Sequence, residues 1–569
     1  MDALPRSRPA DEPMSVSSGG EVLVGVDIGT NSSKGVACRP DGTVLAEARA
    51  EHSVSLPRPG WVEHDADAVW WHDFCVIARQ LMAALPPGSH VAAVSVSACG
   101  PCLLPVDRNG RPLRPGILYR VDTRASDQIK VLLDRYGSDD LLRLGGSKLT
   151  SQSVGPKIIW LRDNEPDVWS KTAHYLTATG YVVFRLTNEY VIDHHHSSYF
   201  GPFIDIRHGR WDLRYADGAV TEEQLPRIRW SNETVGTVTE RAADECGLPE
   251  GTLVTAGSTD GLMEAVAAGL LGQGTLVINY ASVMNLFVTT PRIAATRHLW
   301  LSEGLVPGEY VMAGGVATGG SLTSWFRKQF AREWPQETTS DVTLAHGALA
   351  AEAETSPPGS NGLLMLPYFN GEDTPFYDPD ARGVIAGLSL GTTRGDVYRA
   401  IMESTALGIR HNLVEIRRSG VRIDRVRALG GGAITRLWPQ IVSDMTGLKQ
   451  EVPARTAGSA FSDAFLAGLA TGLVAKDDLE TNWIHIARLV EPDPTVGELY
   501  DRLYTMYGRF YKSTRTLVHE LAAEAKRKVE DALSTPTQGS IATRRVSLTP
   551  SASPERFGSQ ARMTRKQEC

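Results

Sequence analysis

A chain of 569 residues is too long for a single hydrophobic core and predicts two large domains. With 42% hydrophobic residues, 22% charged residues and a formal net charge of −8, it has a globular composition without the basic excess typical of nucleic-acid binding. Six scattered cysteines fit a reducing cytosol, and no uninterrupted apolar run reaches the roughly 18 residues of a membrane span. We therefore expect a cytoplasmic protein with neither a membrane nor a nucleic acid as partner.

Both ends of the chain are predicted to be disordered. Residues 1–20 are rich in Pro, Ser and Gly, and residues 526–569 form a polar, basic tail with few core-forming side chains. The folded part lies between them.

The first strong signal is a strand followed by a glycine-bearing turn, "EVLVGVDIGTNSSKGVACRPDG". Its apolar start predicts a strand that delivers Asp27 to its end, and residues 29–34 predict a turn into a second strand. Such a hairpin presents backbone N–H groups, small hydroxyls and a lysine to an anion, while Asp27 can hold Mg²⁺ through water. It is not a Walker A loop, because the glycine-to-lysine spacing differs and no helix follows. A plain structural hairpin is the alternative.

Two further turns repeat this theme. "TLVINYASVMNLFVTT" predicts a second hairpin with its turn at Ala281 and Ser282. "VRALGGGAITRLWPQIVSDMTG" predicts a strand, a glycine turn at residues 430–432 and a helix, where a nucleotide can approach the backbone at the helix N-terminus. Together, in this order, the three turns favour a duplicated ATPase and sugar-kinase architecture over unrelated structural turns.

The candidate for the chemistry is Asp260, in "EGTLVTAGSTDGLMEAVAAGLL". A strand leads into it and an apolar helix follows. Its structural interpretation is a helix N-cap. Its functional interpretation is a general base that takes the proton of a sugar hydroxyl as that hydroxyl attacks the γ-phosphate of ATP, and both can hold.

The tetrapeptide Cys99-Gly100-Pro101-Cys102 is the signature of thioredoxin-like redox enzymes. In those enzymes a following helix stabilises the thiolate. Here Pro105 and the hairpin signal Asn109-Gly110 predict a strand instead, so we expect a tight bend between two strands rather than a redox site. The run His194-His195-His196 could bind a metal, but no paired His or Cys motif completes such a site, and a loop is the simpler interpretation.

The chain resembles the FGGY carbohydrate kinases over about residues 21–520. The resemblance rests on the motifs above and on three further stretches, "GWVEHDADAVWW", "GPKIIWLRDNEPDVW" and "GLLMLPYFNGEDTPFYDPDARGVIAGLSL". The resemblance implies an α/β fold of two ribonuclease-H-like domains of the actin and hexokinase type, with a cleft between them. It places a sugar and phosphate domain at residues 21–258. A domain with the catalytic base and the nucleotide site follows at residues 259–525.

The resemblance also implies roles for individual residues. Asp260 would be the catalytic base, next to the substrate, and Asp27 the carboxylate near Mg²⁺. Asp122 and Arg124 would lie on the sugar side, with a surface ion pair as the alternative. The other implied contacts are phosphate contacts at Thr30, Asn31, Ser32, Lys34 and Ser282, nucleotide contacts at Gly431, Gly432, Ala433, Thr435 and Gln440, and sugar-loop positions at Cys99, Gly100 and Pro101.

The departures from the family pattern bear mainly on which substrate the protein binds. Xylulose-type kinases usually carry Ser-Gly-Gln-Met-His-Gly at the sugar loop, where this chain has Ser-Ala-Cys-Gly-Pro-Cys at residues 97–102. Gly261 stands where Asn is frequent, and Ala281 narrows the second turn. We expect ATP- and Mg²⁺-dependent phosphorylation of a ketopentose such as xylulose, or of a related ketose or polyol, with a homodimer as an assembly compatible with the family. The alternative is a weakly active or non-catalytic relative that binds sugar or regulates.

Overall fold

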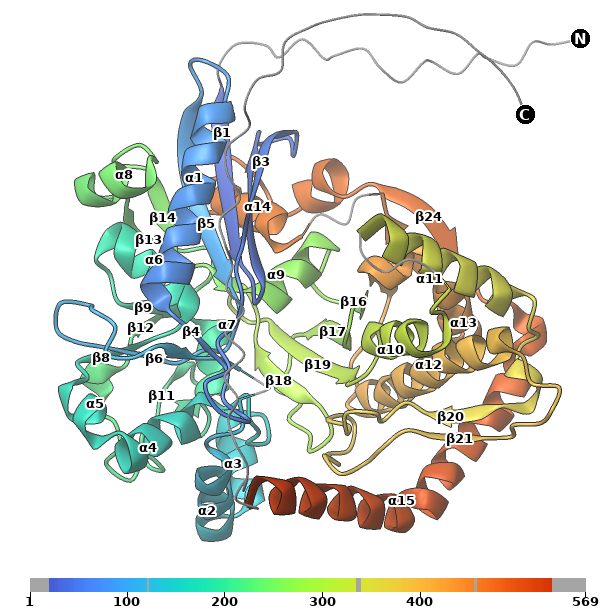
Figure 1. The fold of residues 1–569 in the computed structure, drawn as a ribbon. Helices are drawn as coiled ribbons and strands as arrows, with labels where there is room; N and C mark the ends of the chain where they lie inside the picture. Colours follow the sequence, from blue (N-terminus) through green and yellow to red (C-terminus); the bar gives the residue numbers. More distant parts are fainter. Residues whose placement is uncertain (1–19, 120–121, 334–338, 455–457, 535–569) are drawn as a thin grey trace, which may run out of the picture. The chain divides into compact units, whose positions relative to one another are not determined.

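The computed structural model describes residues 20–119, 122–333, 339–454 and 458–534, which build two seven-stranded sheets covered by helices (Figure 1). In the first sheet β1, β2 and β3 form consecutive antiparallel hairpins, and β5 and β14 run parallel to β1. The near-continuous apolar run of β1 suits a central strand that is buried on both faces. The strand order is β13 (Thr234–Thr237), β14 (Leu253–Thr255), β5 (His90–Ala98), β1 (Glu21–Ile28), β2 (Ser32–Cys38) and β3 (Val44–Glu51), with β15 (Ser258–Thr259) also paired to β5.

The second sheet repeats this pattern. β16, β17 and β19 are antiparallel neighbours, as β1, β2 and β3 are, and β22 and β23 run parallel to β16. The predicted pair of α/β, ribonuclease-H-like units is therefore confirmed. The strand order is β18 (Trp300–Glu303), β19 (Tyr310–Val316), β17 (Met284–Thr290), β16 (Thr275–Tyr280), β22 (Arg425–Leu429), β23 (Gln450–Pro453) and β24 (Ile486–Val490).

Two helices join the sheets. Helix α9 (Asp260–Ala267) and helix α14 (Ser459–Thr471) pack on each other, and α14 also covers β1, β2 and β5. One hydrophobic cluster contains Leu23 of the first sheet, Val277 of the second sheet, and residues of both helices. Because α14 comes late in the chain but packs on the first sheet, the described residues up to His519 form one compact unit, and the predicted domain boundary at residue 258 stays a prediction.

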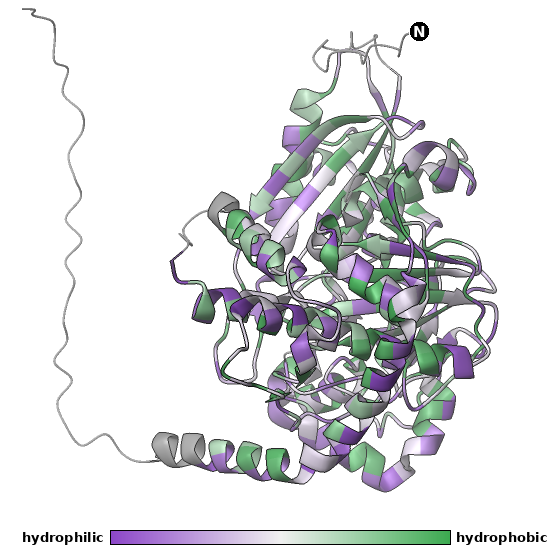
Figure 2. Cartoon of the chain, turned by 90° about the vertical axis from the view of Figure 1, so that its right-hand side faces the viewer, coloured by the Kyte–Doolittle hydropathy of each residue, from purple (hydrophilic) through white to green (hydrophobic). Residues whose placement is uncertain are grey.

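The remaining elements surround the sheets, and exposed helices alternate hydrophilic and hydrophobic residues along their length (Figure 2). No helix among the described residues is both long and apolar enough to cross a bilayer. The other helices are α1 (His72–Ala84), α2 (Ser126–Tyr136), α3 (Ser138–Gly145), α4 (Val154–Asn164), α5 (Pro166–Lys171), α6 (Ala178–Thr187), α7 (His194–Ser197), α8 (Glu240–Cys246), α10 (Gly320–Phe330), α11 (Thr339–Glu354), α12 (Arg394–Arg418), α13 (Leu437–Thr446) and α15 (Gly497–Ser534). The short strands are β4 (Glu63–His64), β6 (Leu104–Val106), β7 (Gly116–Ile117), β8 (His174–Leu176), β9 (Val191–Asp193), β10 (Ile204–Asp205), β11 (Arg210–Trp211), β12 (Arg227–Arg229), β20 (Leu364–Leu366) and β21 (Val384–Ala386).

The predicted disordered tails fall mostly outside the described residues. Helix α15 nevertheless continues to Ser534, so residues 526–534 of the expected tail are helical, and the rest of that tail lies outside the described residues. The reason is local, because Glu, Ala, Lys and Arg dominate this stretch and are strong helix formers.

The contact between β1 and α14 depends on Gly25. A Cβ atom added at Gly25 would overlap the backbone of Ala460 and Ala464, which no side-chain rotation can relieve. We predict that Gly25→Ala lowers the free energy of unfolding by about 3 kcal/mol or more, at the upper end of the usual cost of overpacking. Chemical denaturation measures this change.

Gly347→Ala is the matched control, since a Cβ atom at this helical position meets nothing within 4 Å. It should leave the stability unchanged or raise it by about 0.5–1 kcal/mol. Equal stabilities of the two variants would contradict the close approach of β1 and α14.

Candidate active site

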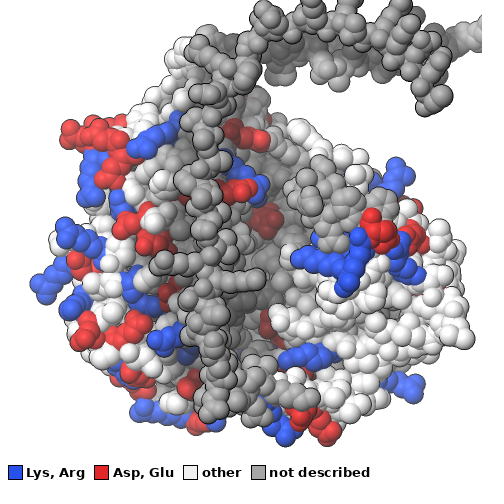
Figure 3. All heavy atoms as spheres, in the orientation of Figure 1, with Lys and Arg blue, Asp and Glu red and all other residues white. Residues whose placement is uncertain are grey.

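A cavity of about 500 Å³ lies between the two sheets, a usual size for a small-molecule site. Acidic atoms are visible inside the hollow of the face shown in Figure 3, whereas acidic and basic side chains are mixed on the surface around it. One wall comes from the first half of the chain and includes Asp27, Thr30, Lys34, Gly100, Leu118, Tyr119, Gln152, His195, Tyr199 and Thr259. The other comes from α9, α14 and the second sheet and includes Asp260, Gly261, Leu262, Glu264, Asn279, Ala281, Ser282, Val283, Asn285, Phe287, Trp300, Ala313, Gly314, Gly458 and Ser459.

The first predicted phosphate hairpin opens into this cavity. Asp27 and Lys34 are directly opposite each other in the register of β1 and β2, so both side chains stand on the same face of the sheet. They line the cavity together with Thr30, whereas Asn31 and Ser32 are not among its lining residues. The turn is shorter than predicted, because β2 already begins at Ser32 and includes Lys34.

Two buried histidines support this turn from behind. His52 lies between Asp73 and the carbonyl of Gly29, with its Nδ1 2.7 Å from Asp73 Oδ2 and its Nε2 3.0 Å from Gly29 O. His52 thus links the Asp73 carboxyl group to the Gly29 carbonyl group. The ring of His64 packs edge-on against it at 5.0 Å, and burial, reinforced by the neighbouring His52, lowers the pKa of His64 to about 4. The two histidines together hold the hairpin in place.

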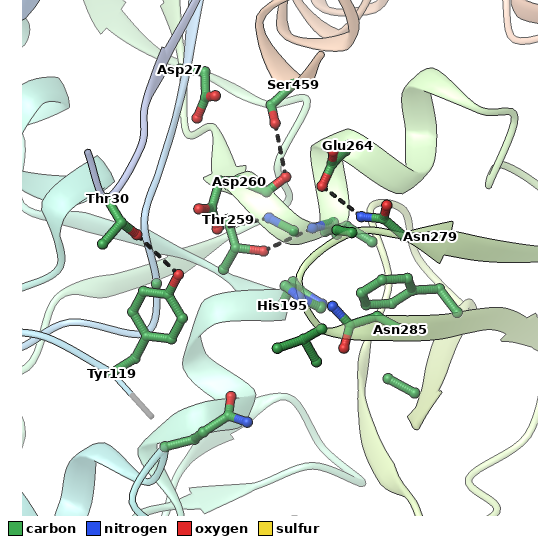
Figure 4. A pocket seen from close by; sticks show the side chains of 18 of the residues that line it. Asp27, Thr30, Tyr119, His195, Thr259, Asp260, Glu264, Asn279, Asn285 and Ser459 are labelled. Carbon is green, nitrogen blue, oxygen red and sulfur yellow. Dashed lines mark hydrogen bonds between the residues drawn. The ribbon is translucent and has the colours of Figure 1, made fainter. Parts of the chain in front are cut away.

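Asp260 is the first residue of α9 and lines the cavity (Figure 4). The N-cap is Thr259, whose side chain accepts from Leu262 N, so the N-cap interpretation of Asp260 is wrong. The carboxyl of Asp260 accepts from its neighbour Gly261 N at 2.7 Å, and its carbonyl accepts from Ser459 Oγ of α14 at 3.0 Å. The backbone of Asp260 is therefore anchored to both helices that join the sheets.

The cavity concentrates negative charge. Burial raises the pKa of Asp260 well above its usual range, and the nearby Asp27 raises it further. Burial also raises the pKa of Asp27, where Lys34 opposes the shift and Glu264 adds to it. Glu264 accepts from Asn279 Nδ2 at 2.8 Å, and burial raises its pKa too. Three carboxyl groups facing one lysine favour the binding of a divalent cation.

A fourth carboxyl lies behind the cavity. Asp463 of α14 is fully buried and accepts from Ser97 Oγ of β5 at 2.6 Å. Burial raises the pKa of Asp463 well above its usual range, opposed by the Ser97 hydrogen bond and reinforced by Asp27. This pair connects α14 to the strand that precedes the predicted sugar loop.

Of the predicted sugar loop, only Gly100 lines the cavity. Pro101 is buried, and Cys99 and Cys102 belong to the hydrophobic core of the first sheet. The two sulfurs are 3.9 Å apart, Cys102 Sγ donates to Cys99 O, and this hydrogen-bonded pairing and burial raise the pKa of Cys99 well above the usual value. A raised thiol pKa is the opposite of what a redox nucleophile needs.

Asp122 and Arg124 form a buried ion pair, so the surface alternative is wrong. Arg124 also contacts Glu63 at 2.8 Å and lies 4.0 Å above the ring centre of Trp61. Neither residue is among those that line the cavity, and their bonds hold the segment beside it.

The second predicted hairpin places residues 281–283 in the cavity wall. The backbone oxygen of Ser282 accepts from Gly319 N and Ser321 N at the start of α10, which ties this turn to that helix. The glycine turn lies next to this hairpin but does not line the cavity. A Cβ atom at Gly430 would meet Asn279 Oδ1, whereas one at Gly431 would meet nothing within 4 Å.

The last predicted nucleotide residues are not among those that line the cavity. Ala433 is buried, Thr435 Oγ1 donates to Gly432 O at 2.8 Å, and Gln440 Nε2 donates to Asp444 Oδ1 at 2.7 Å. The Thr435 bond supports the turn between β22 and α13, whereas the Gln440 bond lies within α13.

Several cavity residues were missed by the sequence analysis. Glu264 is one helical turn after Asp260, and this i, i+4 spacing was a signal that both face the same way. His195 was considered only as a metal ligand. The others, Tyr119, Gln152, Tyr199, Asn279, Asn285, Trp300 and Ser459, come from separate segments and gave no local signal.

Comparisons with known proteins agree with this architecture. The model of the N-terminal domain of the FGGY family of carbohydrate kinases matches residues 22–267, and that of the C-terminal domain matches residues 281–471. The chain belongs to the FGGY family of carbohydrate kinases. It is thus an ATP-dependent kinase with the fold of the actin and hexokinase group.

Relatives in this family differ in substrate. The chain is 26% identical to a xylulose kinase of Staphylococcus epidermidis, over 88% of this chain and 98% of that protein. It is 24% identical to a gluconokinase of Bacillus subtilis, over 81% of this chain and 90% of that protein. The crystal structure of xylulose kinase from Rhodospirillum rubrum superposes with a TM-score of 0.81 at 30% identity, covering 88% of this chain and all of that one.

The buried carboxyl of Asp463 predicts a pH-dependent stability. Its pKa is raised in the folded state, so its contribution to stability is present below about pH 4 and is lost as pH rises through the folded pKa. We predict that Asp463→Asn, which stays neutral, becomes more stable than the wild type as pH rises from 5 to 8. The difference should grow by at most about 1.4 kcal/mol per pH unit, measured by chemical denaturation.

Asp477→Asn is the control, because Asp477 is exposed and its substitution should not change the pH profile. Parallel profiles for the wild type and Asp463→Asn would mean that Asp463 is ionised in the folded protein.

Proposed function

We propose that this kinase transfers the γ-phosphoryl group of ATP to a hydroxyl of a ketopentose such as xylulose, or of a related ketose or polyol, with Asp260 as general base. The observation that carries the proposal is the place of Asp260, at the rigid start of α9 in the wall of the cavity between the sheets. Within the described residues its carboxyl has no ion-pair partner, so it is available to a substrate hydroxyl. The xylulose kinases among the relatives support a ketopentose.

Asp260 would accept the proton of the attacking hydroxyl. A neutral alcohol is a poor nucleophile, and a carboxylate within hydrogen-bond reach removes its proton as the new P–O bond forms. The raised pKa of Asp260 makes it a stronger base than an exposed aspartate once it is ionised. Lys34 opposes the rise in the pKa of Asp27 and Glu264, so it favours their ionised forms.

The phosphates would lie between the two hairpins. Lys34 and Thr30 contribute from the first hairpin, and Ser282 contributes its hydroxyl from the second. Asp27 fits a divalent cation, because its Oδ1 is buried without a hydrogen-bond partner in the described residues and because burial and the nearby Glu264 raise its pKa. Bound there, Mg²⁺ would neutralise phosphate charge during transfer.

The nucleotide would extend from this point to the glycine turn. Gly431 leaves open space beside its backbone, and the side chain of Ile434 is 71% exposed, which offers an apolar contact to a base. Gly432 serves packing instead, since a Cβ atom there would press on Trp438 and Tyr280. Thr435 and Gln440 would act by holding the turn.

The altered sugar loop is the observation that favours the second candidate, a weakly active or non-catalytic sugar-binding protein. Gly100 brings only backbone to the cavity, where a histidine side chain is usual nearby. Measuring ADP release by the purified protein with ketopentoses, ketohexoses and polyols separates the two candidates. Sugar binding without turnover would favour the second.

We predict that Asp260→Asn lowers kcat by about 10²–10⁴, the usual effect of losing a general base, while ATP and sugar still bind. The amide keeps the size of the carboxyl but cannot take the proton. Steady-state kinetics with calorimetric binding measures both quantities.

Asp27→Asn should act differently, by raising the Mg²⁺ concentration needed for half-maximal velocity. Turnover by Asp260→Asn at a near wild-type rate would exclude Asp260 as the base, even if the fold and the substrate were as proposed.

We predict that Gly431→Asp weakens ATP binding about tenfold or more, because it places a negative charge beside the nucleotide without disturbing the protein core. The measurement is the Kd for ATP by calorimetry. Gly347→Asp, at another open position, is the control and should leave this Kd unchanged. An unchanged Kd in Gly431→Asp would place the nucleotide elsewhere.

A further inference from the structure

The three consecutive histidines of α7 point in different directions and make different hydrogen bonds. His194 stacks on Trp230 at 3.8 Å, and its Nδ1 is 2.9 Å from Glu303 Oε2. His196 Nδ1 is 2.8 Å from Asp193 Oδ1, in the interior of the protein. Only His195 lines the cavity (Figure 4). About 100° of rotation per helical residue accounts for this divergence.

The protonation of the His195 ring follows from its surroundings. Its Nδ1 lies 2.9 Å from the backbone oxygen of Glu303, which can only accept, so Nδ1 carries the hydrogen. The ring is fully buried apart from the cavity, and burial lowers the pKa of His195 to about 4. At neutral pH the other nitrogen, Nε2, is therefore an acceptor, and no hydrogen bond within the described residues engages it.

An acceptor at this place selects for hydroxyl groups. The adjacent Tyr199 packs edge-on against the His195 ring at 5.4 Å and also lines the cavity, as do Gln152 and Trp300. This part of the wall has hydrogen-bonding and apolar surface but no cation.

The negative charge of the whole cavity also favours a substrate that carries hydroxyl groups and no negative charge. Among its described lining residues, three are acidic and only Lys34 is basic. Lys34 stands next to Asp27, where the phosphates are expected. A sugar acid would bring a further negative charge that no arginine or second lysine in the lining could pair, and leaving a buried charge unpaired is costly.

We propose that His195 is a specificity-determining residue, whose Nε2 accepts a hydrogen bond from a hydroxyl of a neutral sugar or polyol. The inference rests on the proposed function and names a residue that would recognise its uncharged substrate. A neutral ketose would satisfy the free acceptor, whereas an aldonate would meet the acidic wall.

The test compares His195→Leu, which removes the acceptor, with His195→Gln, which keeps an acceptor oxygen. The variant His195→Leu should raise the KM for D-xylulose, or for the best neutral substrate of the wild type, about tenfold. The reason is that a buried hydroxyl of the bound sugar is left without a hydrogen-bond partner. Gln should recover part of this loss, and the KM for ATP should not change in either variant. Quenching of Trp fluorescence on sugar addition, expected because Trp300 lines the cavity, measures sugar affinity without turnover.

His194→Asn is the matched control. His194 also contacts Glu303 but lies outside the cavity lining, so this variant should leave the sugar KM unchanged. That result would exclude a general disturbance around Glu303 as the cause of the His195→Leu effect. The wild type should use neutral ketoses or polyols at least about 100-fold more efficiently than D-gluconate in kcat/KM.

The outcomes separate the inference from the proposed function. Wild-type turnover of a neutral sugar with an unchanged KM in His195→Leu would overturn the role of His195 alone. Gluconate as the best substrate would overturn the preference for neutral sugars. A wild type that binds and phosphorylates no carbohydrate would overturn the proposed function, and the inference with it.

Discussion

The close packing of α14 on β1 is the constraint on which the rest of the molecule depends. Gly25 lets the helix backbone approach the strand more closely than any side chain would allow. Helix α9 packs on α14, so this approach also determines where Asp260, at the start of α9, lies relative to Asp27 near the end of β1. The hydrogen bond from Ser459 to Asp260 O then ties the start of one helix to the start of the other. The two carboxyl groups of the proposed mechanism are positioned by the same contact.

This arrangement also brings three carboxyl groups together in the wall of the cavity. Burial raises the pKa of Asp27, Asp260 and Glu264, and neighbouring carboxyl groups raise the pKa of Asp27 and Asp260 further. Lys34 only partly compensates at Asp27 and Glu264. A site of this kind binds a divalent cation more favourably than a neutral site would, since the bound positive charge relieves the repulsion between the carboxyl groups. The same repulsion helps Asp260 to take a proton. Binding and base strength thus have one electrostatic origin.

Residues outside the cavity determine how rigid its loops are. The His52 ring holds the first hairpin through Gly29 O, and Arg124 holds the segment around residue 122 through Asp122, Glu63 and two tryptophans. Phosphoryl transfer depends mainly on positioning and charge stabilisation. Substitutions at such supporting residues would therefore affect turnover without touching the substrate.

The sequence by itself determined the features that depend on local order. The strand–turn–strand signals around Asp27 and Ser282, the glycine turn before α13 and the strand leading to Asp260 predicted both hairpins, the duplicated α/β fold and the family. Each of these signals is written in consecutive residues, where apolar runs and glycines control the backbone directly. Only the tertiary structure decided which side chains share the cavity, because that depends on contacts between distant segments. It placed His195, Gln152 and Trp300 in the wall, and buried Arg124 and both cysteines of the Cys-Gly-Pro-Cys stretch away from it. A side chain's neighbours across the sheets are set by the packing of α9 and α14, and no local pattern carries that information.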